Sequence, residues 1–366
     1  MPNSLIPALD PAPLPGPPWL FQVLWVLTFL IHVVFVNTVL GGTLLAALAG
    51  LAGEGRRETR TLFVEVNSWA ISLAITFGIA PLLFIQVVLG RFFYTATILV
   101  AWAWLGMLVI LTVAYYLNYV AKFRLRAGKG TGAVLWVEAV CFLAIAAILV
   151  TVNLLHLQPD HWAAVADHPW AALSDRAFVP RYLHFVLASL AMAGALAAWV
   201  AVRRAGKGGD PAACRGMARF GIRAALVATL LQLVDGFWLL LALPEEVLRS
   251  FMRGGAATMA PLGLGVMAGV LLLVVLAGIS DPLAQPTRVR RVAELVVGAM
   301  VVMVVTRHQL RDFYLASARA GEHVAVAPQI GPLALFLGVF VLCIGLTVWV
   351  LVRSAKDRPA PGERAA

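Results

Sequence analysis

The chain has 366 residues, of which 61% are hydrophobic and only 13% are charged, and its formal net charge is +10. About a quarter of the residues of an ordinary soluble domain are charged, so this composition excludes a soluble fold of one to three domains. The mean hydropathy of +0.90 indicates a polytopic helical membrane protein instead, because one membrane span needs about 20 mostly apolar residues.

The proline-rich residues 1–18 lack the basic segment and the small-residue cleavage site of a signal peptide. We expect an N-terminal extracytoplasmic cap over 1–18, a transmembrane helical domain over 19–353 and a cytoplasmic tail over 354–366. The apolar runs predict transmembrane helices at roughly 19–50, 62–90, 95–121, 133–155, 180–202, 217–243, 259–279, 292–313 and 330–352. The predicted fold class is therefore all-α, a membrane bundle of about nine helices.

Most of the 28 Lys and Arg residues lie in alternate loops, near 56–60, 122–129, 203–223 and 288–291, and in the C-terminal tail. Positively charged loops stay on the cytoplasmic side of a membrane. The pattern therefore predicts an N-terminus outside and a C-terminus in the cytoplasm, in a multi-pass protein of the cell inner membrane. This topology explains the basic charge without a nucleic-acid partner.

The cysteines are Cys141, Cys214 and Cys343, and no two of them have the C-x-x-C spacing. Covalent c-type heme attachment, a thiolate zinc site and an iron–sulfur cluster are therefore not expected.

Three histidines lie within the predicted spans. His32 is in the first span, His184 lies one turn inside the fifth, and His308 is near the outer end of the eighth. A helix rises 1.5 Å per residue, which puts His184 and His308 at a similar depth and His32 somewhat deeper. Axial ligation of b-type heme requires neutral imidazoles that project from membrane helices. The competing interpretation is that each histidine links two helices by a hydrogen bond. His156, which ends the fourth span, is interpreted as a polar terminus, with metal ligation as the minor alternative.

Other side chains on the same spans suit a heme. Arg181, Arg307 and Arg311 lie in the outer belt near the histidines, where they would either neutralise heme propionates or extend toward water. Met300 and Met303 stand at helical spacing and are either thioether ligands or core residues. Four interior polar residues suit helix contacts or a quinone head group: Asn67, Gln86, Asn118 and Gln232.

Four segments, taken in order, resemble helices of subunit I of the cytochrome bd-type quinol oxidases: 28–41, 77–86, 180–194 and 231–236. That family has nine spans with the N-terminus outside. The resemblance implies that His32 binds a heme of the oxygen-reducing pair and that His184 binds the low-spin heme b. In the family the second ligand of that heme is a methionine on a later helix, a place that Met300, Met303 or His308 could take.

Two differences from the family argue against oxygen reduction. Segment 101–116 contains neither of the glutamates of the family's third helix, and the loop over 244–258 is much shorter than the family's quinol-binding loop. We therefore expect an electron-transfer subunit of a respiratory chain with one or two hemes b. It would be a quinol-linked oxidoreductase subunit that passes electrons between the quinone pool and a c-type cytochrome or a second membrane subunit.

Two other classes of protein compete with this interpretation. One is a heme-free integral membrane scaffold or anchor, in which the histidines only link helices. The other is a small-solute transporter. It has less support because the spans contain few acidic residues and no paired broken helices.

Overall fold

The computed structural model describes residues 5–9, 12–51 and 56–356. Of the predicted tail over 354–366, the part after residue 356 lies outside the described residues. Within these ranges nine long helices form the bundle: α1 Pro18–Leu51, α2 Arg57–Leu99, α3 Ala101–Arg126, α4 Gly132–Leu157, α6 Phe178–Ala205, α7 Pro211–Leu241, α9 Ala256–Ala277, α10 Pro286–Leu315 and α11 Ile330–Lys356. The only β-type backbone pairing in the described part is an isolated bridge between Leu14 and Val326. The predicted all-α polytopic class is confirmed.

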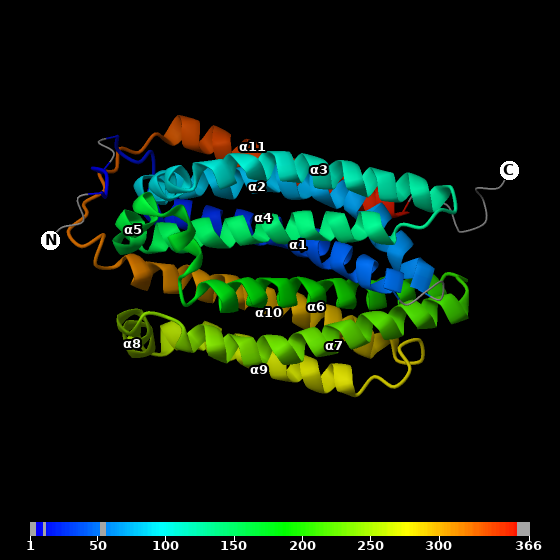
Figure 1. Cartoon of the computed structure of the whole chain (residues 1–366). Coiled ribbons are helices and arrows are strands. Elements are labelled where there is room, and N and C mark those ends of the chain that lie inside the picture. Colours follow the sequence, from blue (N-terminus) through cyan, green and yellow to red (C-terminus); the bar gives the residue numbers. More distant parts are fainter. Residues whose placement is uncertain (1–4, 10–11, 52–55, 357–366) are drawn as a thin grey trace.

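Eight helices of the described chain are long and apolar enough to cross a membrane, namely all of the long helices except α10. Helix α10 contains the predicted span 292–313. Its first two turns carry Arg288 and Arg290, and Arg307 and Arg311 lie near its other end. The apolar segment between them is therefore short. It nevertheless packs against α6 and α9 and runs within the bundle (Figure 1). The chain is thus a multi-pass membrane protein.

The connections of the bundle alternate between its two ends (Figure 1). The α3–α4, α6–α7 and α9–α10 loops gather at one end, which we call the basic end because the predicted basic loops lie there. The opposite end holds α5 (Trp162–Asp167), its two flanking 3-10 turns (Pro159–His161 and Pro169–Leu173), and α8 (Glu245–Arg253). We call this the α5–α8 end. Which end faces the cytoplasm stays a prediction.

Small residues let α1, α6 and α7 approach each other closely. A Cβ atom added at Gly41 would overlap the backbone carbonyl of Ser189 on α6. One added at Gly194 would lie 2.5 Å from the carbonyl oxygen of Gly221 on α7. Helices in lipid gain little from the hydrophobic effect and associate through such close packing. These contacts therefore set the distances at which α1, α6 and α7 present their polar side chains to each other.

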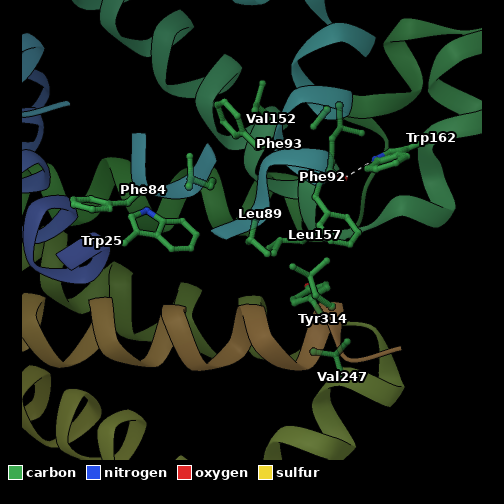
Figure 2. Close-up of a cluster of buried hydrophobic side chains, with 14 of the residues drawn as sticks. Trp25, Phe84, Leu89, Phe92, Phe93, Val152, Leu157, Trp162, Val247 and Tyr314 are labelled. Carbon is green, nitrogen blue, oxygen red and sulfur yellow. Dashed lines mark hydrogen bonds between the residues drawn. The ribbon is translucent and has the colours of Figure 1, made fainter. Parts of the chain in front are cut away.

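Aromatic and aliphatic side chains fill the bundle near the α5–α8 end (Figure 2). Trp162 of α5 is fully buried, and its indole N–H donates to the Leu155 carbonyl at 2.8 Å. Helix α2 is kinked at Leu89, whose φ and ψ are −135° and 28°, and it continues past the kink so that Phe92 is buried in the same cluster. This cluster joins the parts of α1, α2, α4 and α10 that lie at the α5–α8 end.

The close α6–α7 contact can be tested with a paired substitution. Gly194→Val is expected to destabilise the protein by about 1–3 kcal/mol or more, because overpacking forces the backbones apart. Gly106→Val on α3 is the control, since a Cβ atom there meets nothing within 4 Å. Thermal unfolding in detergent, followed by size-exclusion chromatography, measures the difference. Equal losses in the two variants would contradict the assigned role of Gly194.

Candidate functional site

His32 projects from α1 onto α2. Its Nδ1 lies 2.9 Å from the carbonyl oxygen of Ala74, and its ring lies against Gly78, where an added Cβ atom would be 2.9 Å from Cε1. A carbonyl oxygen can only accept a hydrogen bond, so Nδ1 carries the proton of the neutral ring. Nε2 is then the nitrogen with the free lone pair, and it has no hydrogen-bond partner among the described residues.

His184 projects from α6 onto α7. Its Nδ1 lies 3.1 Å from Oδ2 of the buried Asp235, and its Nε2 lies 3.3 Å from the amide nitrogen of Gln232. The carboxylate accepts from Nδ1–H, and the amide donates to Nε2. This is the same tautomer as in His32. About 25% of the His184 side chain is left uncovered by protein, so the imidazole borders open space.

Both histidines therefore have the hydrogen-bonding pattern typical of metal ligands. A ligating imidazole usually donates its other N–H to a carboxylate or a backbone carbonyl, which fixes the ring and the tautomer. His32 has the carbonyl version of this contact and His184 the carboxylate version. The donor set thus fits axial ligation of heme iron through Nε2.

The third predicted ligand, His308, lies on α10, which runs along α1. Its ring meets the Trp25 ring edge-on with centroids 5.7 Å apart. Its Nε2 accepts a hydrogen bond from Nη2 of Arg311 at 2.9 Å. In contrast to His32, this histidine therefore already has its Nε2 occupied by a cationic donor.

The predicted propionate-binding arginines do come together, at the α5–α8 end of the bundle. The Arg311 guanidinium lies 4.0 Å from the Trp25 ring centroid, and that of Arg307 lies 4.7 Å from the Phe29 ring centroid. Arg181 of α6 lies within electrostatic reach of Arg307, which is also within reach of Arg311. We call Arg181, Arg307 and Arg311 the arginine cluster.

The arginine cluster carries more positive charge than its protein neighbours balance. Arg311 pairs with Asp312 at 3.0 Å, and Arg181 donates to the neutral amide oxygen of Asn153 at 2.9 Å. Neither Arg181 nor Arg307 forms a salt bridge within the described ranges. Carboxylates bind such guanidinium groups strongly and often in bidentate fashion. The cluster therefore has the chemistry that heme propionates require.

The two candidate methionines contact different helices. The Met300 sulfur lies 3.8 Å from the side-chain amide nitrogen of Asn37 on α1. Met303 packs on α9, where a Cβ atom added at Gly265 would lie 2.5 Å from its terminal methyl carbon. Ligation by either sulfur stays a prediction.

His156, which the sequence indicated as a polar terminus, is buried beside the arginine cluster. It is only 3% exposed, its Nδ1 lies 3.1 Å from the Val152 carbonyl oxygen, and all three cluster arginines are within electrostatic reach. In this tautomer Nε2 bears the lone pair, and it has no hydrogen-bond partner among the described residues, as in His32. The only signal in the sequence was its position at the same end of its span as the cluster.

The pairing of His184 with Gln232 and Asp235 was also missed. A usable signal was present, because residues three apart lie on one face of a helix. Both residues therefore had to face the same neighbour of α7.

The fold and these side chains define a class: a multi-pass α-helical membrane protein whose α1 and α6 carry histidines hydrogen-bonded through Nδ1 to neighbouring helices. The structure is similar to that of the bd oxidase from Geobacillus thermodenitrificans, with a TM-score of 0.67 over 93% of this chain and 99% of that chain, at 14% sequence identity. No sequence model of a known protein family matches the chain, and no curated protein matches it. The likeness confirms the resemblance predicted from the sequence at the level of the fold.

A double-mutant cycle tests the contact between His32 and Gly78. Gly78→Val is expected to lower thermal stability because the valine overlaps the imidazole. The same change should cost less in a His32→Ala background, with a coupling energy of about 0.5–3 kcal/mol. Gly90→Val on the same helix is the control, since its nearest neighbour atom, on Tyr94, is 3.7 Å away. Additive losses for Gly78→Val and His32→Ala would contradict the contact.

Proposed function

We propose that this chain is a b-type cytochrome subunit of a respiratory chain, which passes electrons between the quinone pool and an extracytoplasmic redox partner. The observation that carries the proposal is the tautomer shared by His32 and His184, in which Nδ1–H is donated to a carbonyl or a carboxylate and Nε2 bears the lone pair, which in His184 accepts from the Gln232 amide. The fold shared with a bd oxidase supports it. The site of action would be the cell inner membrane.

In this proposal His184 would hold one heme and His32 another. Asp235 would orient the His184 ring and increase the electron density on its Nε2, the atom to which the Gln232 amide donates in this structure. Met300, Met303 or His308 would supply the second ligand of the His184 heme. When bound, heme b supplies a one-electron iron couple whose potential the protein tunes.

The arginine cluster would hold the propionates. Arg181 and Arg307 lack a carboxylate partner among the described residues, and both sit at the end of the bundle that the loop charges place outside. A heme edge at this end would lie close to the outer surface. That placement suits electron exchange with a c-type cytochrome or with a second membrane subunit, and it suits a quinone head group in the outer part of the membrane.

Heme counting tests the proposal directly. A pyridine hemochrome assay on the purified chain is expected to give one or two hemes b, and His184→Ala should remove one equivalent. His323→Ala is the matched control, because His323 is exposed in the loop before α11. A dithionite-reduced wild-type sample without b-type absorption bands would overturn the assignment.

The arginine cluster should also set the heme potential. Arg307→Gln is expected to lower a heme midpoint potential by a few tens of millivolts, because losing a positive charge disfavours the reduced iron. For comparison, about 1.4 kcal/mol corresponds to about 59 mV for one electron. Arg249→Gln is the control, because Arg249 lies on α8 and pairs with Glu245. A redox titration measures the potential of both variants. An unchanged potential in Arg307→Gln would contradict an interaction between the arginine cluster and a heme.

A heme-free scaffold is the second candidate, and one observation favours it. His32 and His184 already hydrogen-bond to the neighbouring helices, as residues that only link helices would. Under this alternative His184→Ala would reduce stability in a protein that carries no heme.

A further inference from the structure

A cavity of about 110 Å³ opens between α2 and α3 at the basic end of the bundle. Arg57 and Glu65 line it from the first turns of α2, and Lys122, Leu125 and Arg126 line it from the last turns of α3. The cavity therefore lies where both helices reach the membrane surface. It is at the end opposite the arginine cluster and has no part in the proposed heme site.

The charges around this cavity are not balanced by the protein. Arg57, Lys122 and Arg126 outweigh Glu65, and none of these cations forms a salt bridge in the part of the chain that the structure describes. Lys122 instead donates to the Ser68 hydroxyl at 3.0 Å. Three arginines elsewhere at the basic end do have acidic partners, at 2.7–3.3 Å: Arg204 with Glu58, Arg215 with Asp281, and Arg290 with Glu294.

The size and donors of the cavity match a phosphate group. The cavity of about 110 Å³ has room for a group of a few heavy atoms, such as a phosphate. Ammonium and guanidinium donors bind phosphate oxygens through charge-assisted hydrogen bonds. The surrounding net positive charge favours an anion over a zwitterion, whose own ammonium group would be repelled.

The surface beside the cavity indicates that this phosphate belongs to a lipid. Trp69, one turn along α2 from Glu65, is 40% exposed. On α3, Phe123, one turn before Arg126, is 63% exposed. These side chains offer an apolar surface to acyl chains that run from the cavity along the α2–α3 pair, which is packed side by side (Figure 1).

We propose that the α2–α3 cavity binds the phosphate of an anionic phospholipid. Lys122 and Arg126 hold the phosphate from α3, and Arg57 holds it from α2. Basic pockets between membrane helices on the cytoplasmic side are suited to such head groups, because the anionic lipids of that leaflet supply the ligand. The site would fix the edge of the bundle formed by α2 and α3 against the surrounding lipid.

The test uses the full chain, delipidated in neutral detergent and incubated with phosphatidylglycerol or phosphatidylcholine. Phosphatidylglycerol is expected to raise the unfolding temperature and to remain bound in native mass spectrometry, whereas phosphatidylcholine does neither. Lys122→Gln and Arg126→Gln should each weaken phosphatidylglycerol binding about tenfold, the effect of losing one charge-assisted contact. Lys122→Arg, which keeps the charge and reports on folding, should retain binding.

Lys207→Gln is the matched control, because Lys207 is an exposed cation of the basic end outside the cavity. A loss of binding in Lys207→Gln equal to that in Lys122→Gln would overturn the proposal in favour of general surface charge. Inorganic phosphate that stabilises the protein as much as phosphatidylglycerol would overturn the assignment to a lipid. Equal retention of phosphatidylcholine would overturn the selectivity for anionic lipid. Heme content plays no part in these readouts.

Discussion

The hydrogen bond from each interior imidazole to a neighbouring helix is the interaction on which the site depends. A polar group inside a bilayer has no water to satisfy it, so its partners must come from the protein or from a cofactor. His32 uses the Ala74 carbonyl and His184 uses the Asp235 carboxylate. Because both contacts take the Nδ1 proton, the bonds that join the helices leave the lone pair of each ring on Nε2, the atom that would ligate iron. The scaffold and cytochrome interpretations thus share one structural basis.

The helices could be predicted from the sequence because the bilayer imposes a length of about 20 apolar residues on every span. Their ends were less accurate. The second run was expected to end near 90, yet α2 continues to Leu99 past Gly90 and Arg91. Tertiary contacts explain the difference: Phe92 and Phe93 are buried in the aromatic cluster of the α5–α8 end. Packing against distant residues, which hydropathy does not encode, decided where this helix ended.

The candidate residues were predictable by type, and their partners were not. Few side chains in the spans can ligate a metal, so the histidines stood out. Which helix each one faces depends on how close the helices approach, and that follows from contacts such as Gly194 with Gly221. Glu138 of α4 shows the same limit, because the structure buries it completely and its partner, the Thr43 hydroxyl 3.5 Å away, comes from α1.

The arginines of the bundle differ in what balances their charge. At the basic end Arg204, Arg215 and Arg290 have acidic partners. At the α5–α8 end Arg307 and Arg311 lie over the Phe29 and Trp25 rings. An aromatic face offsets part of the cost of desolvating a guanidinium without neutralising its charge. That arrangement keeps the charge available to an anionic group in the membrane, a property that extension toward water alone would not require.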